Sequence, residues 1–155
     1  KRYNHIVLGN NYRMTDINAS IGIEQLKKLK KTIVEKERVS KKYNKIFMNV
    51  KEVKTPYIPS YVSQHSWYNY TIKVPSNIRD SLVKFLYKKN VETRLSFPPV
   101  HIQPYYKKKY KYKNNSFKKS FKTYSEFIDL PIWANLSQKQ ILYIGNIIIN
   151  FLKKK

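Results

Sequence analysis

The sequence contains no cysteine, only three glycines and only three histidines. Without cysteine the chain can form no disulfide, no thiolate nucleophile and no zinc site with cysteine ligands. The histidines, His5, His65 and His101, have no metal-ligand spacing and no acidic cluster beside them, so we expect no bound metal. The glycines are too dispersed for a phosphate-binding loop, and no serine lies in a Gly-x-Ser-x-Gly sequence. If the chain takes part in catalysis, it supplies part of a site whose main body lies elsewhere.

The sequence also lacks an apolar run long enough for a membrane span. The segment ILYIGNIII, residues 141–149, is far shorter than the roughly eighteen apolar residues that cross a bilayer, and Gly145 and Asn146 interrupt it. The chain begins at Lys1 rather than at a methionine, and its start resembles neither a signal peptide nor a transit peptide. We therefore expect a soluble, cytoplasmic piece of a longer protein, with enough residues to bury a modest core.

Acidic residues are few: nine, against 32 lysines and arginines, for a formal net charge of +23. One explanation is a polyanionic partner such as nucleic acid. Five of the 32 cations are arginine, which leaves 27 lysines, whereas recognition of phosphates and bases favours the planar guanidinium of arginine. Lysine also accompanies many Asn, Ile, Tyr and Phe residues, the amino acids of A/T-rich codons, and we favour this compositional explanation. A nucleic-acid partner nevertheless stays open because of the segment YYKKKYKYK, residues 105–113, in which aromatic rings between lysines can stack on bases.

Hydrophobic periodicity predicts a long helix from Thr15 to about Phe47. The Thr15 side chain can cap the first turn, and Asp16 places an anion where the helix dipole favours it. Residues 1–50 are thus expected to form a loop and a long connecting helix. The apolar stripe of this helix, with spacings of three, four or seven residues, consists of Gly22, Leu26, Leu29, Ile33, Ser40, Tyr43 and Phe47.

The rest of the chain, residues 51–155, is expected to form a small α+β domain. An extended connector with two prolines covers residues 53–63. The order of the elements after it indicates a small sheet with helices on one face. The predicted elements are a strand from Trp67 to Val74 with Tyr68, Tyr70, Ile72 and Val74 on one face, a helix over 77–90 that stops at Asn90, a strand over 91–97, a polar aromatic loop over 101–117, a short helix over 118–128, and a last helix that begins at Ser137 with Gln140 completing a capping box.

The first stretch suited to a binding site is GNNYRM, residues 9–14. Asn11, Tyr12 and Arg13 lie just before the first helix, where backbone N–H groups and the helix dipole favour an anion such as phosphate. The planar guanidinium of Arg13 can hold a phosphate or a carboxylate. The plainer interpretation is an ordinary Asn-Asn turn whose neighbours pack locally.

The second stretch is FPPVHIQPYY, residues 97–106. Its three prolines stiffen a loop that presents His101, Gln103 and Tyr105, and rigid loops with exposed polar groups often line substrate pockets. The plainer interpretation is a proline-rich surface loop with a hydrogen-bonded histidine.

Three motifs taken together resemble a known family. LGNNYRMTDINASIGIEQLKKL (residues 8–29), VETRLSFPPVHIQPYY (91–106) and YSEFIDLPIWANLSQKQ (124–140) resemble the C-terminal region of the DegT/DnrJ/StrS aminotransferases, which are pyridoxal phosphate enzymes acting on nucleotide-linked keto sugars. The resemblance covers essentially the whole chain. It implies the small C-terminal domain of an aspartate-aminotransferase-like (type I) fold, of α/β class when intact, with residues 1–50 forming the connection from the large domain.

The resemblance also implies roles for individual residues. In the family a lysine in the large domain carries the cofactor, and that lysine precedes the region present here, so the chain alone is expected to be inactive. The family works as a homodimer in which the asparagine of the NYRM motif reaches the cofactor phosphate of the partner subunit, and its amino donor is by habit glutamate or glutamine. The implied cofactor-binding residues are Asn11 and Arg13, and the implied substrate-binding residues are Tyr12, His101, Gln103 and Tyr105.

Other hypotheses remain open at this point. The alternative from a different class is a stand-alone basic module that binds RNA or single-stranded DNA through the tyrosines and lysines of residues 105–113, although nucleic acid is the less favoured partner. A decayed or split gene product would keep the fold without activity. Family members that have lost the cofactor lysine act as sensors or regulators, and a fragment without that region is compatible with this too.

Overall fold

The computed structural model describes residues 12–154. By compactness the chain divides after Lys31, with Lys1–Lys31 in one unit and Thr32–Lys155 in the other. The division expected at residue 50 remains a prediction. In the described part of the chain, no helix is both long and apolar enough to cross a membrane.

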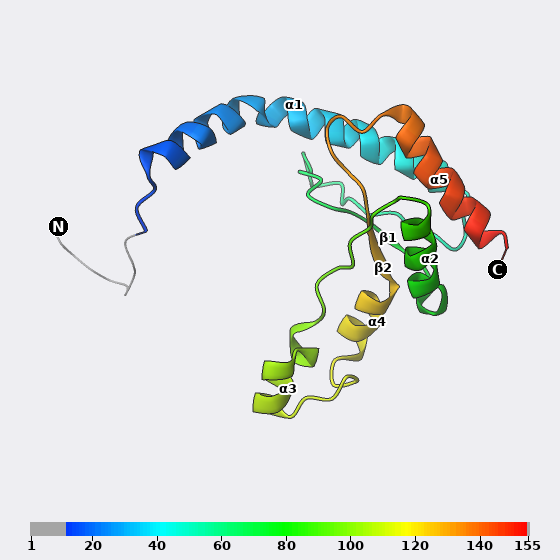
Figure 1. The fold of residues 1–155 in the computed structure, drawn as a ribbon. Helices are drawn as coiled ribbons and strands as arrows, with labels where there is room; N and C mark the ends of the chain where they lie inside the picture. The colour runs from blue at the N-terminus through cyan, green and yellow to red at the C-terminus, as the bar shows by residue number, and fades with distance from the viewer. Residues whose placement is uncertain (1–11, 155) are drawn as a thin grey trace. The chain divides into compact units, whose positions relative to one another are not determined.

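The long helix α1 spans Asp16–Phe47, as predicted (Figure 1). Thr15 caps it, since its Oγ1 accepts a hydrogen bond of 3.3 Å from the N–H of Asn18. The predicted stripe is buried only at its C-terminal end, at Ser40, Tyr43 and Phe47, together with Val39. Leu26 and Leu29 in the first half are exposed. The predicted apolar face is therefore covered by the rest of the described chain only along the last turns of α1.

Two short antiparallel strands form the sheet, β1 (Tyr70–Lys73) and β2 (Phe127–Leu130). Their register sets Tyr70 opposite Leu130 and Ile72 opposite Ile128. The predicted strand from Trp67 begins three residues late because Trp67 has a left-handed backbone, with a φ of 50°. This reverses the expected alternation there: Trp67 is buried and Tyr68 is exposed.

Three predictions between residues 91 and 128 are wrong in part. The segment 91–97 forms no strand but a single bridge, in which Arg94 pairs with Asp129 of β2. The expected loop over 101–117 contains a 3₁₀ helix, η1 (Val100–Ile102), and the helix α3 (Pro104–Tyr110), because Pro104 pre-sets the first helical φ. The short helix α4 spans Lys118–Glu126 and ends two residues before the predicted end at residue 128. The apolar run that follows it is the strand β2.

The remaining helices end and begin as their capping residues predict. The helix α2 (Ser76–Lys88) is followed by Asn90 in the left-handed region, with a φ of 58°. There the Asn90 N–H donates to Tyr87 O (3.0 Å) and the Val91 N–H to Leu86 O (2.9 Å), which is a Schellman motif. The helix α5 (Gln138–Leu152) begins with the capping box of Ser137 and Gln140.

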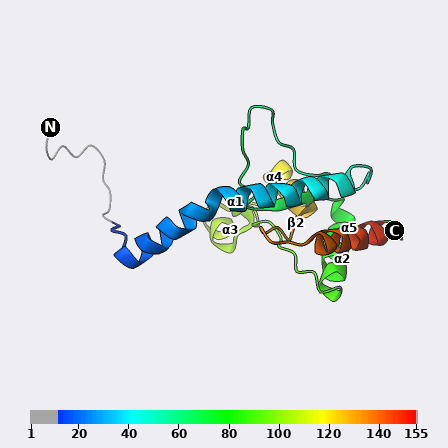
Figure 2. The ribbon, with the colours of Figure 1, turned by 90° about the horizontal axis from the view of Figure 1, so that it is seen from above.

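The hydrophobic core lies between the sheet and the helices of the larger unit. The last turns of α1 contribute Tyr43 and Phe47, and β1 contributes Tyr70 and Ile72. Helices α2 and α5 lie side by side against it (Figures 1 and 2). On α5, Gly145 packs so closely against α1 that an added Cβ would lie 2.6 Å from Ile46 Cγ2.

The two helical glycines predict opposite effects of the same substitution. Gly145→Ala forces the branched Ile46 side chain to move and lowers the free energy of unfolding by about 1–3 kcal/mol. The Cβ added by Gly22→Ala meets nothing within 4 Å. Because alanine has the better helix propensity, this substitution raises the free energy of unfolding by up to about 1 kcal/mol. Urea unfolding followed by circular dichroism measures both, and a stabilised Gly145→Ala would contradict the close packing of α5 on α1.

Candidate functional site

The first predicted stretch lies at the start of α1. Asn11 lies outside the described residues, while Tyr12 and Arg13 are both exposed, Tyr12 by 87%. The N-terminus of α1 already carries the Thr15 cap and the Asp16 carboxylate in its first turn. The Thr15 cap and the Asp16 carboxylate thus occupy the helix end, and the exposed guanidinium of Arg13 is the cationic group of this described segment.

The second predicted stretch places His101 in a defined polar setting. His101 lies on η1 and is 7% exposed. Its Nε2 lies 3.2 Å from the carbonyl oxygen of Asn114, and its ring centroid lies 5.0 Å from that of Phe117. Because a carbonyl only accepts, Nε2 carries the hydrogen, and in the neutral ring Nδ1 keeps the lone pair.

Gln103 and Tyr105 surround the start of α3. The half-buried Gln103 uses its backbone here, since its N–H donates to Val100 O (3.1 Å) and its carbonyl accepts from the Lys107 N–H (2.9 Å). Tyr105 is 64% exposed, and its ring meets the edge of Tyr106 at 5.2 Å. The structure thus gathers the three predicted residues of this stretch at one end of α3. Tyr12 and Arg13 belong to the other compact unit.

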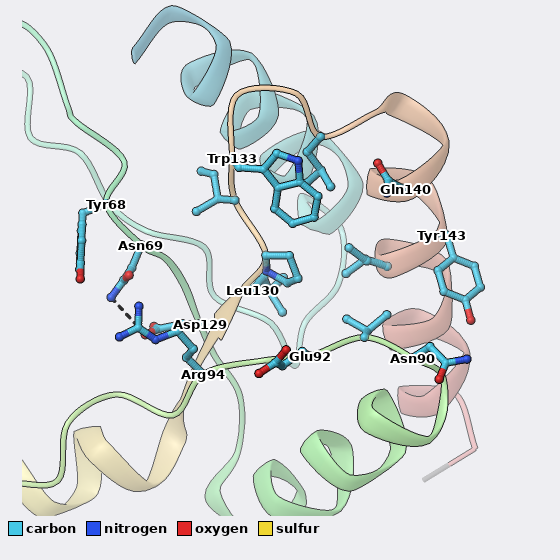
Figure 3. Close-up of a pocket in the computed structure, with 15 residues that line it drawn as sticks. Tyr68, Asn69, Asn90, Glu92, Arg94, Asp129, Leu130, Trp133, Gln140 and Tyr143 are labelled. Carbon is cyan, nitrogen blue, oxygen red and sulfur yellow. Dashed lines mark hydrogen bonds between the residues drawn. The ribbon is translucent and has the colours of Figure 1, made fainter. Parts of the chain in front are cut away.

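Sequence reasoning missed a cavity of about 570 Å³ on the larger unit. Its wall combines the segment after α2, the end of β2 and the first turns of α5 (Figure 3). The polar and aromatic lining residues are Tyr68, Asn69, Asn90, Glu92, Arg94, Asp129, Trp133, Gln140 and Tyr143. These residues come from distant segments, and the only sequence signal was one acidic residue in the short run FIDL.

Asp129 is the buried carboxylate of this cavity. Its Oδ2 accepts from Asn69 Nδ2 at 3.1 Å, and its Oδ1 accepts from Thr71 Oγ1 at 2.5 Å and from Ser96 Oγ at 3.4 Å. Its backbone exchanges two hydrogen bonds with Arg94, of 2.8 and 3.1 Å. Asp129 therefore holds the segment of Arg94 against β2, and its own oxygens are occupied by neutral donors.

The solvent-exposed charges of the cavity are the side chains of Glu92 and Arg94. Trp133 and Tyr143 add half-exposed rings, and the Tyr143 hydroxyl donates to Lys89 O at 3.0 Å. This combination suits a polar organic molecule with an apolar face rather than a metal ion. Among residues 12–154, no three His, Asp or Glu side chains gather as a metal site would require.

The hydrogen bonds of Asp129 predict a local stability cost. Asp129→Ala leaves Asn69 and Thr71 without their acceptor and lowers the free energy of unfolding by about 1–3 kcal/mol. The matched change Glu92→Ala, on the same cavity wall, stays within about 0.5 kcal/mol. Thr71→Val in the Asp129→Ala background then costs less than Thr71→Val alone. Additive costs in urea unfolding would show that the two side chains do not interact.

Comparison with known proteins identifies the family. The profile of the DegT/DnrJ/EryC1/StrS aminotransferase family matches residues 1–149. An uncharacterized protein of Methanocaldococcus jannaschii is 35% identical over 150 residues, which cover 93% of this chain and 38% of that protein. The GDP-perosamine synthase of Escherichia coli O157:H7 is 31% identical over 156 residues, which cover 100% of this chain and 41% of the synthase. The chain thus spans about two fifths of the length of these curated relatives.

Solved structures share the fold. The aminotransferase TlmJ of Streptoalloteichus hindustanus superposes with a TM-score of 0.83 at 21% identity, over 97% of this chain and 40% of that one. A DegT DnrJ EryC1 StrS aminotransferase of Brucella abortus gives a TM-score of 0.79 at 25% identity, over 97% and 39%. The expected fold class is confirmed: the two-stranded sheet and its helices are part of the larger aminotransferase fold. The chain belongs to the DegT/DnrJ/EryC1/StrS aminotransferase family.

Proposed function

We propose that this chain is the C-terminal part of a pyridoxal-phosphate-dependent aminotransferase that transfers an amino group to a nucleotide-linked keto sugar, for the synthesis of a surface polysaccharide. The observation that carries the proposal is the family match over residues 1–149. Relatives named GDP-perosamine synthase and spore coat polysaccharide biosynthesis protein SpsC support the sugar substrate. The intact protein is proposed to be a cytoplasmic homodimer, with glutamate or glutamine as amino donor.

Pyridoxal phosphate, bound to a lysine upstream of this chain, would supply the electron sink for amino transfer. The residues of this chain that we propose to bind near pyridoxal phosphate are Asn11 and Arg13. Arg13 fits the role, because its side chain is exposed and its guanidinium matches the oxygens of a phosphate. We propose that Asn11 holds the cofactor phosphate of the partner subunit and that Arg13 supplies positive charge near the cofactor or the sugar nucleotide, so that the site is shared between two copies.

His101, Gln103, Tyr12 and Tyr105 are proposed to face the substrate. The Nε2 of His101 is engaged by Asn114 O, which leaves Nδ1 of the neutral ring to accept a hydrogen bond from a substrate hydroxyl. The hydrogen bond between His101 Nε2 and Asn114 O also fixes the orientation of the imidazole ring on η1. The role of His101 is therefore to orient the sugar, and Tyr105 and Tyr12 offer exposed rings and hydroxyls.

Asn11→Ala in the full-length protein tests the shared cofactor site. Loss of a side-chain donor to a charged phosphate weakens cofactor binding by about tenfold or more, since hydrogen bonds to charged groups contribute roughly 1.5–3 kcal/mol. Titration of the apoprotein with pyridoxal phosphate, followed by absorbance, measures the change. The adjacent Asn10→Ala serves as the control and binds as the wild type does. Equal affinity of the Asn11 variant and the wild type would remove Asn11 from the phosphate site.

A further inference from the structure

The cavity of the larger unit has two kinds of wall. One is the segment after α2, which carries the charged side chains of Glu92 and Arg94. The other comes from the end of β2, the loop after it and the first turns of α5 (Figure 3). The apolar lining residues of this second wall are Leu130, Pro131, Ile132, Trp133, Leu136 and Ile144. A ligand of the cavity therefore meets charge on one side and apolar surface on the other.

Glu92 and Arg94 offer two opposite charges. Both side chains are exposed, and within residues 12–154 neither of them forms an ion pair. By contrast, Glu24 and Glu37 each pair with a lysine of α1. Two residues that stand two positions apart in an extended segment send their side chains to the same side, roughly 6–7 Å apart. One small molecule can therefore contact both charges.

The carboxylate of Asp129 does not take up the charge of Arg94. Its oxygens accept hydrogen bonds from Asn69, Thr71 and Ser96, and its contact with Arg94 runs through the two backbones. The backbone of Arg94 is thus fixed on the cavity wall, while the guanidinium keeps its N–H groups for a ligand. A planar guanidinium binds a carboxylate with two parallel hydrogen bonds.

The apolar wall is held in place by hydrogen bonds to the loop after β2. The Tyr43 hydroxyl donates to Pro131 O at 3.1 Å, and Arg38 Nη2 donates to Leu136 O at 3.0 Å. Within the loop, the Leu136 N–H donates to Trp133 O at 3.2 Å. Trp133 nevertheless stays 46% exposed. Its loop is therefore anchored while part of its indole remains available for stacking.

We propose that this cavity binds a free α-amino acid with an aromatic side chain. The α-carboxylate binds Arg94, the α-ammonium binds Glu92, and the ring stacks on the indole of Trp133. A ligand with a single charge leaves one of the two cavity charges without a partner, and a small side chain leaves apolar wall uncovered. A volume of about 570 Å³ accommodates a molecule of this size. The inference goes beyond the proposed function, whose amino donors, glutamate and glutamine, have polar side chains.

Calorimetric titration of the full-length holoprotein with L-phenylalanine tests the inference. Three matched probes each lack one feature of this amino acid: phenethylamine lacks the carboxylate, 3-phenylpropionate lacks the ammonium, and L-alanine lacks the ring. We expect phenylalanine to bind about tenfold or more tightly than each probe, because each probe loses a charge-assisted hydrogen bond or a buried ring.

Variants of the lining residues locate the binding. Arg94→Gln weakens phenylalanine binding by about tenfold but does not weaken phenethylamine, which has no carboxylate to lose. Glu92→Gln likewise weakens phenylalanine but not 3-phenylpropionate, and Trp133→Leu weakens phenylalanine by about threefold or more. The controls Lys45→Gln and Glu52→Gln alter exposed charges elsewhere and leave binding unchanged. Circular dichroism verifies that each variant is folded.

Each other outcome overturns the inference. Absence of phenylalanine binding at millimolar concentration shows that the cavity takes no such ligand. A single-charge probe that binds as tightly as phenylalanine shows that one of the two charges takes no part. Equal affinity in the wild type and both charge variants places the binding elsewhere on the protein. A change in the cofactor absorbance on addition of phenylalanine shows that the amino acid reacts at the cofactor. If methyl α-D-glucoside binds through Trp133 while phenylalanine does not, the cavity serves a saccharide instead.

Discussion

The contact between Tyr43 and Tyr70 ties helix α1 to the sheet. Their rings lie 4.9 Å apart and both side chains are fully buried. The Tyr43 hydroxyl donates to Pro131 O at 3.1 Å, beyond the end of β2, and the Tyr70 hydroxyl donates to Asn44 Oδ1 at 2.5 Å, back on α1. Burial raises the pKa of both tyrosines above the ordinary value, so they remain neutral donors at physiological pH. Two buried hydroxyls are satisfied, and three elements are joined.

The position of Asp129 depends on this junction. With Tyr70 fixed, the register sets Thr71 opposite Asp129, and the Asp129 backbone then pairs with Arg94. The cavity wall forms as a consequence. The first residue of β2 directly follows α4, so the same pairing also anchors the segment that carries α3 and its tyrosines. A sheet of four-residue strands thus positions both the cavity wall and the α3 segment of the larger unit.

The parts of the fold that the sequence predicted well are set by neighbours in the chain. Thr15, Asn90 and Ser137 each act on a backbone group within four residues, so their signals are local. The strand β2 was missed because its partner β1 lies more than fifty residues away, and a four-residue apolar run has no periodicity of its own. For the candidate site the same division holds. The stretch with His101 could be proposed from its residues and stays a prediction as a site, whereas the contact of His101 with Asn114 and the cavity arise only from tertiary structure.

The lysines of this chain have different surroundings in different parts of the fold. On α1 lysines lie one helical turn from glutamates and form exposed ion pairs, which add little to stability. Around α3 the lysines lie beside aromatic rings that stack on one another. Hydrogen bonds of the loop after α3 hold these rings in place. Random accumulation of lysine does not require such ordering. The lysines of α3 and its loop therefore surround an ordered group of aromatic rings, whereas those of α1 lie on an exposed helix face.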